Sequence, residues 1–178
     1  MRRLTAHYPG AVRDLQEALS ILRDLGYRHG QANALTSLGN VRRLTGDYPG
    51  AVRDLEEALA VSRDLGYRFG QAITHLFLGD MRRLTGDYPG AARDLEEALA
   101  ISRDLGDRRG QASALLFLGS VRRLTGDYPG AARDVEEALA INRDLGDRRG
   151  EVMTLNEAGS PRSRLMASVS SRSRAAPG

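Results

Sequence analysis

The sequence predicts an all-α protein in which antiparallel helix pairs stack into a solenoid, and three observations support this fold class. The stretch Thr-Gly-Asp-Tyr-Pro-Gly-Ala begins at Thr45 and returns at Thr85 and Thr125, with a weaker copy from Thr5 in the same register. A fixed repeat of roughly 20 to 50 residues is the signature of a stacked repeat protein. Each repeat also contains two stretches whose apolar residues lie three or four positions apart, as on one face of a helix. Glycine and proline separate these stretches and mark the turns.

The repeated stretch is itself predicted to be the turn between the two helices of a pair. Gly46 can adopt the positive φ that ends a helix. Asp47 can offer its carboxylate to the free N–H groups of the next helix, and Pro49 suits the first turn of that helix. The same residue types return in the later copies, so we expect each copy to end one helix and begin another.

The expected order of units follows from this register. It is a half unit at 1–29, complete units at 30–69, 70–109 and 110–149, a partial unit at 150–159 and a tail at 160–178. The expected helices of the half unit and the first complete unit are 11–25, 31–44 and 49–65. Pro161 opposes helix continuation, and the Ser/Arg-rich tail has few large apolar residues, so we expect the tail to be disordered.

Each expected helix carries one apolar stripe and a polar remainder. Leu35 and Leu38 belong to the stripe of the first helix, and Leu55 and Ala58 to that of the second. One face of each helix is therefore predicted to be buried. The charged residues of the second helix, Asp54 among them, are expected to face solvent.

A glycine lies inside the first helix of every complete unit, at Gly39, Gly79 and Gly119. Glycine within a helix costs about 1 kcal/mol relative to alanine. Its return at each copy indicates that the paired helices approach closely at this position.

Composition excludes several kinds of site. The 26 basic residues are all arginine, and the chain has no cysteine. A P-loop lysine, a Schiff base, a disulfide and a thiolate zinc site are therefore excluded. No apolar run approaches the length of a membrane span and no charged-then-apolar leader begins at Met1, so we expect a cytoplasmic protein with no membrane partner.

The net charge of +3 resides in the tail, because residues 160–178 hold four arginines and no acid. The remaining 22 arginines are balanced by 23 acidic residues. Four charges with no interleaved aromatic residue argue against a nucleic-acid partner.

The turn and stripe residues together resemble a known repeat family, the tetratricopeptide repeat. The residues that carry the resemblance in the first complete unit are Leu35, Leu38, Gly39, Gly46, Asp47, Tyr48, Ala51, Leu55 and Ala58. The resemblance covers residues 1 to about 159, and the 40-residue period is similar to the longer variant found in kinesin light chains and in the sensor arrays of bacterial signalling ATPases. It implies a right-handed superhelix whose first helices line a concave groove that binds a protein or peptide. Arg42, Arg82 and Arg122 stand where the family usually has aromatic residues.

The copies differ mainly in their first helices. The second-helix stretches 91–105 and 131–145 differ at only two positions. Because the resemblance places the first helices along the groove, the divergent surface is the candidate binding surface. The residues expected there are Asn33, Thr36, Asn40 and Arg43, then Ile73, Leu76, Asp80 and Arg83, then Ser113, Leu116, Ser120 and Arg123.

Two interpretations of the recurring arginines Arg43, Arg83 and Arg123 are open. Their guanidinium groups could hold a ligand carboxylate through paired hydrogen bonds. Asn40 matches the asparagine with which many relatives hold a partner's backbone or terminal carboxylate, so this interpretation predicts an acidic or C-terminal peptide ligand. Alternatively, each arginine pairs with a nearby Asp or Glu of the chain itself. The low energetic worth of exposed ion pairs favours this second interpretation.

The sequence contains no arrangement typical of an enzyme. Glu56 and Glu57 are adjacent and would point in different directions on a helix. His7, His29 and His75 share no metal-ligand spacing. A nucleophile–base pair and a phosphate-binding loop are also absent, so we expect a non-enzymatic protein without cofactors or metals.

Two function classes therefore remain open. The first is an interaction scaffold that binds a protein or peptide in its groove and that could be a fragment of a larger regulator. The second is a self-assembling structural module with no dedicated groove ligand. Neither end shows an obvious capping helix, since Met1 enters halfway through a unit and the last unit lacks its second helix. We therefore expect homo-oligomers through the uncapped ends, for example a dimer in which the partial units complete one another.

Overall fold

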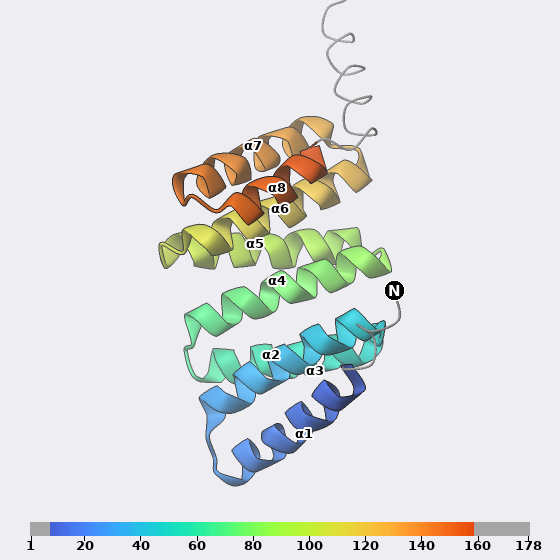
Figure 1. The fold of residues 1–178 in the computed structure, drawn as a ribbon, viewed down its shortest axis with the longest axis vertical. Helices are drawn as coiled ribbons and strands as arrows, with labels where there is room; N and C mark the ends of the chain where they lie inside the picture. Colours follow the sequence, from blue (N-terminus) through green and yellow to red (C-terminus); the bar gives the residue numbers. More distant parts are fainter. Residues whose placement is uncertain (1–7, 159–178) are drawn as a thin grey trace, which may run out of the picture.

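In a computed structural model, the chain is described over residues 8–158, and this part consists of eight helices with no strand (Figure 1). The helices are α1 (Tyr8–Asp24), α2 (Arg28–Thr45), α3 (Tyr48–Asp64), α4 (Arg68–Thr85), α5 (Tyr88–Asp104), α6 (Arg108–Thr125), α7 (Tyr128–Asp144) and α8 (Arg148–Ala158). The all-α prediction is confirmed. The expected tail at 160–178 and the expected helix end at 1–5 lie outside the described residues.

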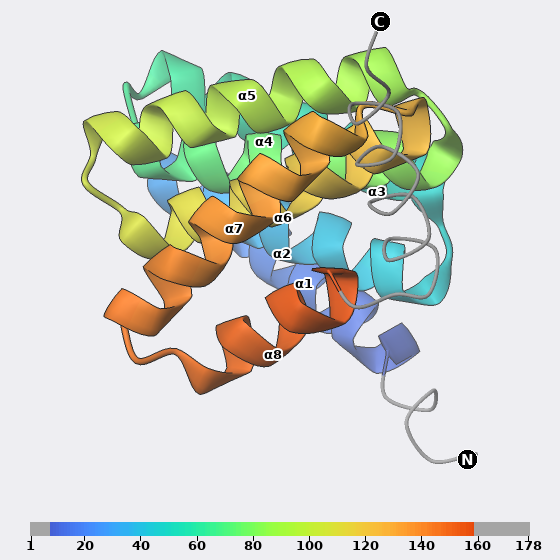
Figure 2. The same cartoon turned by 90° about the horizontal axis from the view of Figure 1, so that it is seen from above.

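The helices pack in antiparallel pairs that stack along one direction. The pairs are α2 with α3, α4 with α5, and α6 with α7, and each second helix also packs on the first helix of the next pair. The predicted solenoid of helix pairs is confirmed. Figure 2, which looks down the stack, shows that successive pairs are rotated relative to one another. The expected unit starts at Gly30, Gly70, Gly110 and Gly150 each fall in the first turn of a first helix.

The turn inside each pair has the predicted chemistry. Gly46 has a φ of +83°, and its N–H donates to the carbonyl oxygen of Arg43 at 3.2 Å. The carboxylate of Asp47 accepts from the N–H of Gly50 at 3.0 Å, and Pro49 lies in the first turn of α3. α2 therefore ends, and α3 begins, through signals that are local in the sequence.

The core is a row of apolar clusters, each built from consecutive helices. One cluster joins α1, α2 and α3 through Leu19, Leu35 and Ala58. The next joins α3 and α4 and includes Leu55 and Met81, and a third joins α5, α6 and α7. Each helix is thus buried by its neighbours in the chain, as expected for a repeat array.

The helical glycines lie where the paired helices approach most closely, as predicted. A Cβ atom added at Gly39 would lie 2.7 Å from the Cγ atom of Leu55 and 3.2 Å from the carbonyl oxygen of Ala51. A side chain at this position would force Leu55 to shift. The small residue therefore allows α2 to rest directly on α3.

Candidate functional site

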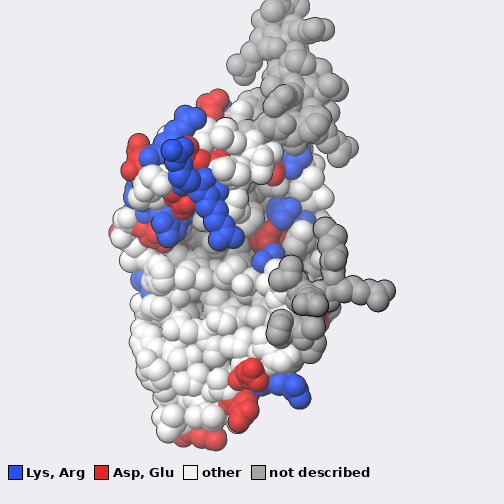
Figure 3. Space-filling model, in the orientation of Figure 1, with Lys and Arg blue, Asp and Glu red and all other residues white. Residues whose placement is uncertain are grey.

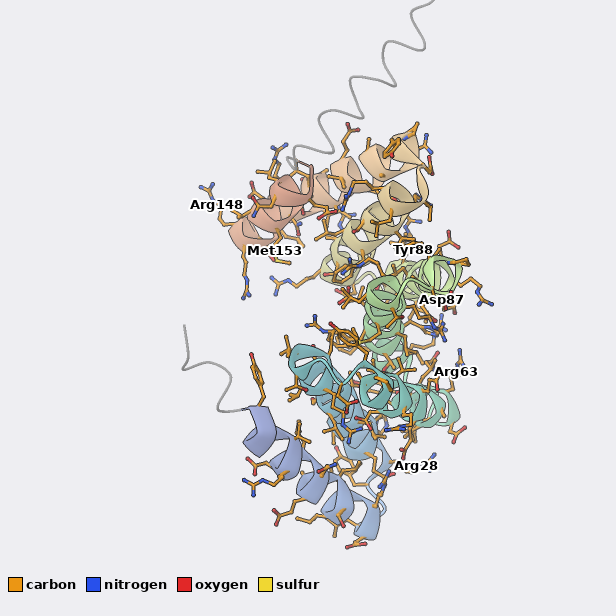
Figure 4. All side chains as sticks on the ribbon, turned by 90° about the vertical axis from the view of Figure 1, so that its right-hand side faces the viewer. Arg28, Arg63, Asp87, Tyr88, Arg148 and Met153 are labelled. Atoms are coloured by element: carbon orange, nitrogen blue, oxygen red, sulfur yellow. The ribbon has the colours of Figure 1, made fainter. Side chains whose placement is uncertain are left out.

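The first helices, α2, α4, α6 and α8, lie next to one another along the stack, since α4 contacts both α2 and α6, and α6 contacts α8. In Figure 4, the side view, the stack curves so that the first helices line its inner side. The candidate residues lie on three of these helices, α2, α4 and α6. We call the inner surface that the first helices form the concave face.

The candidate residues form four rows across α2, α4 and α6, one residue from each helix in each row. In the first row, Asn33 is exposed while Ile73 and Ser113 are half-buried. In the second row, Thr36, Leu76 and Leu116 are all half-buried. The other two rows are Asn40, Asp80 and Ser120, then Arg43, Arg83 and Arg123.

Thr36 and Leu76, in the second row, make contacts within the protein. The hydroxyl of Thr36 donates to the carbonyl oxygen of Ala32 at 2.9 Å and lies 3.3 Å from the hydroxyl of Thr74. Leu76 packs against the apolar cluster of α5, α6 and α7. Leu76 and Leu116 nevertheless keep part of their apolar surface at the concave face.

Two of the three residues in the third row are buried. Asn40 is half-buried, but Asp80 is 4% exposed and Ser120 is 6% exposed. The structure therefore brings Asp80 and Ser120 under the concave face rather than onto it.

The fourth row, the recurring arginines, is held by internal partners. Arg43 donates from Nε and Nη2 to the Oδ1 of Asn40 at 3.2 and 3.1 Å, and its Nη1 lies 3.5 Å from the Oδ2 of Asp80. Arg83 donates to the Oδ1 of Asp80 at 2.6 and 3.1 Å. Asp80 thus joins two arginines from consecutive first helices.

The two arginines nearer the C-terminal end also contact the protein itself. The guanidinium of Arg83 lies 5.9 Å from the centre of the Phe117 ring, within the range of a cation–π contact. Arg123 donates to the Oε1 of Glu157, on α8, at 2.6 and 3.2 Å. Each recurring arginine therefore has an internal polar partner, which is the second of the two arrangements considered for them.

A second set of arginines lies between the helices of each pair. Arg42, Arg82 and Arg122 pair with Asp54, Asp94 and Asp134 respectively. Asp94 and Asp134 are each 6% exposed, and Asp54 is half-buried. The expectation that the Asp54 position faces solvent is wrong, because the arginine across the turn draws this carboxylate into the helix interface.

Burial has an electrostatic consequence for these carboxyls. Desolvation raises the pKa of Asp54 and of Asp134 above the ordinary range, although Arg42 and Arg122 oppose the shift. Arg122 donates to both oxygens of Asp134, at 2.5 and 2.6 Å, whereas the Oδ2 of Asp54 is buried without a hydrogen bond. The pair of Arg122 with Asp134 therefore uses both carboxylate oxygens in hydrogen bonds, whereas the equivalent pair of Arg42 with Asp54 does not.

The middle pair contains a polar cluster that sequence reasoning missed. His75 is 5% exposed, and its Nδ1 lies 3.0 Å from the Oδ1 of Asp94, whose other oxygen is bound by Arg82. Arg63 approaches the Nε2 of His75 at 3.4 Å. The signal in the sequence was that His75 replaces Leu35 and Leu115, which are each 1% exposed core residues.

Part of the concave face carries few charged side chains. Figure 3 shows that the half of this face over α1, α2 and α4 is largely uncharged except at its lower edge. Within residues 8–158, no group of His, Asp and Glu side chains is arranged to hold a metal ion. None of the helices in the same range is both long and apolar enough to cross a lipid bilayer.

Comparisons with known proteins agree with this architecture. A family model described as tetratricopeptide repeat matches residues 5–64 and 70–144. The crystal structure of BtubC (BKLC) from P. vanneervenii is similar with a TM-score of 0.75 and 20% identity, over 99% of this chain and 79% of that one. At this identity the likeness concerns the fold alone. A search of curated protein sequences found no match.

Proposed function

The chain belongs to the tetratricopeptide repeat family, and on that premise we propose that it is a non-enzymatic cytoplasmic scaffold that binds a protein segment on its concave face. Tetratricopeptide repeats generally mediate protein–protein interaction.

One observation carries the choice of surface: the first helices, which line the concave face, differ more between units than the second helices do. The second-helix stretches 91–105 and 131–145 are identical except at two positions. The first row changes from Asn33 to Ile73 to Ser113, and the second from Thr36 to leucine. Because these positions are not buried, core packing does not require their residues to change from unit to unit. Their divergence is the pattern expected when each unit contacts a different part of one ligand.

The ligand we infer is an extended peptide with apolar side chains near α4 and α6. Ile73, Leu76 and Leu116 supply a half-exposed apolar strip there, and Asn33 supplies an exposed amide on α2. Such a strip can accommodate alternate side chains while amides hold the peptide backbone. The apolar strip is therefore assigned the larger share of the affinity.

The proposal depends less on an acidic group in the ligand than on its apolar side chains. Arg43 donates from Nε and Nη2 to Asn40, and Arg83 donates from the same atoms to Asp80, so a ligand carboxylate that took these donors would replace Asn40 or Asp80. Exchange with Asn40 leaves a neutral amide behind. Exchange with Asp80 would leave a carboxylate that is 4% exposed with one arginine fewer, at an energetic cost. Arg43 is therefore the better candidate for a carboxylate contact.

The test is selection of peptides from a random displayed library on the immobilised chain, followed by affinity measurement with two double variants. Ile73→Glu with Ser113→Glu places two charges on the concave face. Ala60→Glu with Ala100→Glu places the same two charges on exposed positions of α3 and α5. We expect the first variant to weaken the selected peptide by roughly tenfold or more and the second to leave it unchanged.

Two results would contradict this proposal. One is equal binding by both double variants when circular dichroism shows both to be folded. The other is the failure of any library to yield a binding peptide. Replacing Arg43 and Arg83 together by alanine tests the carboxylate contact separately. Unweakened binding would show that these two arginines do not bind the ligand, and it would not affect the role of the apolar strip.

A further inference from the structure

The two terminal helices of the described chain are the two halves of a repeat unit. α8 begins at Arg148, where α6 begins at Arg108, so α8 is a first helix. α1 runs from Tyr8 to Asp24, and α3 from Tyr48 to Asp64, so α1 is a second helix. Within residues 8–158, neither packs against the helix that would complete its own unit.

α8 exposes the apolar residues that the interior first helices bury. Leu155 is 47% exposed, whereas its counterparts Leu35 and Leu115 are each 1% exposed. Val152 is 58% exposed, and its counterpart Ala112 is 3% exposed. The uncovered surface of α8 is therefore the one that a second helix covers in every interior unit.

α1 exposes the corresponding surface of a second helix. Ile21 is 52% exposed, whereas its counterparts Val61, Ile101 and Ile141 are 7%, 1% and 2% exposed. A first helix covers this surface in the interior units, and α8 is a first helix with its own surface uncovered.

The charges at the two ends match as well. The start of each interior first helix is tied to the end of its second helix by an arginine–aspartate pair. These pairs are Arg28–Asp64 at 2.8 Å, Arg68–Asp104 at 3.1 Å and Arg108–Asp144 at 3.3 Å. The counterparts at the ends are Arg148 on α8 and Asp24 on α1, and neither forms an ion pair with another described residue.

A second kind of pair joins the second helices of neighbouring units. Arg23 binds Glu57 at 2.5 Å, and Arg103 binds Glu137 at 2.9 Å. Continued past the ends, the same pattern would join Arg143 on α7 to Glu17 on α1. Arg143 pairs with Glu151 at 4.0 Å, a contact too long for a hydrogen bond, and Glu17 of the next copy could take its place.

From these observations we propose that α8 of one copy packs against α1 of a second copy of this chain, so that two half units form one complete repeat. The contact reproduces one seen three times inside the chain, between α2 and α3, α4 and α5, and α6 and α7. Leu155 of one copy is covered by α1 of the next, and Arg148 of one copy pairs with Asp24 of the next. This interface involves only the ends and does not depend on any ligand of the concave face.

The contact is head to tail, since it joins different surfaces of the two copies. An interface of this kind propagates from copy to copy unless the rotation closes a ring. The wild-type chain should therefore form species larger than a dimer as its concentration rises, and their mean mass should increase with concentration.

The test uses sedimentation velocity on the full chain with one blocking substitution at each end. Ile21→Arg blocks the α1 surface and Leu155→Arg blocks the α8 surface, at positions already half exposed in the folded chain. Each variant alone should be monomeric, with association weakened by roughly tenfold or more. An equimolar mixture should form a dimer and stop there, because the intact α8 of the first variant meets the intact α1 of the second. Ala100→Arg, on the exposed face of α5, is the matched control and should associate like the wild type.

A charge exchange tests the ion pair within the same interface. Asp24→Arg and Arg148→Asp should each weaken association, and the double variant should restore it. The proposal is overturned if the wild-type chain stays monomeric up to its solubility limit, as it would if other residues of the chain cover α8. It is also overturned if either blocked variant still dimerises alone, since that result requires a contact between two like ends.

Discussion

α6 and α8 occupy the same place in consecutive units, but only α6 is buried. Both begin with the same local signal, since Asp107 and Asp147 accept from backbone N–H groups three residues later, at 3.0 and 2.9 Å. Leu115 on α6 is 1% exposed, and Leu155 on α8 is 47% exposed. The difference is the presence of α7 against α6. Local sequence thus begins a helix in this protein, while neighbouring helices determine whether it is buried.

The largest expected effect separates these two leucines. Leu115→Ala should lower the free energy of unfolding by about 2 to 5 kcal/mol, because it opens a cavity between α5, α6 and α7. Leu155→Ala should change it by less than about 0.5 kcal/mol in the monomer, because the side chain is already half in solvent. Urea unfolding at low protein concentration, followed by circular dichroism, measures both. Equal losses would show that α8 is covered in solution.

A smaller effect on stability should distinguish two interior helix pairs, because their two helices approach each other to different distances. A Cβ at position 79 would lie 2.5 Å from the Cγ of Leu95, whereas one at position 119 would lie 3.1 Å from the Cγ2 of Val135. Both alanine variants gain about 1 kcal/mol of helix propensity. Gly79→Ala should nevertheless be less stable than Gly119→Ala by about 1 to 2 kcal/mol, because its methyl group forces Leu95 to shift.

The same urea measurement tests this order, with the wild type as reference. Leu95→Val in the Gly79→Ala background should recover part of the loss, because it reproduces the smaller partner found at Val135. Equal stability of the two alanine variants would mean that the helices separate without cost.

The smallest expected effect is a pH dependence at the interface of α6 and α7. Burial raises the pKa of Asp134, so the folded state binds its proton more tightly than the unfolded state. This carboxyl therefore makes the wild type less stable as the pH rises from about the unfolded pKa through the folded one. Asparagine does not titrate. The unfolding free energy of Asp134→Asn minus that of the wild type should consequently increase with pH between the ordinary aspartate pKa of 3.8 and neutrality.

Asp54→Asn should show the same sign, since burial raises the pKa of Asp54 as well. Unfolding free energies of both variants and the wild type, measured at matched pH values, are sufficient. A difference that falls as the pH rises would indicate that the arginine outweighs desolvation at that site.

The fold was predictable because its signals are local and repeated. Gly46 and Asp47 act within four residues of themselves, so their roles could be assigned without knowing any distant contact. The apolar stripes repeat with them, and three agreeing copies remove the ambiguity that one copy would leave. The close approach at Gly39 followed from the cost of a helical glycine.

The polar partners were harder to predict because they lie across a turn or a unit boundary. Asp54 was expected in solvent, yet Arg42 holds it between α2 and α3. The available signal was that both residue types recur together in all three complete units. The contact between His75 and Asp94 occurs once, so no repetition could reveal it. The binding role of the concave face remains a prediction, and the structure narrows it by placing Asp80 below that face.

The pairing of Asp80 with Arg43 also has a mechanical consequence. It ties the inner edge of the joint between the α2/α3 pair and the α4/α5 pair. The next joint is held at both edges, by Arg83 and Phe117 on the inner side and by Arg103 and Glu137 on the outer side. Bending this array should therefore open the outer edge of the first joint more easily than either edge of the second.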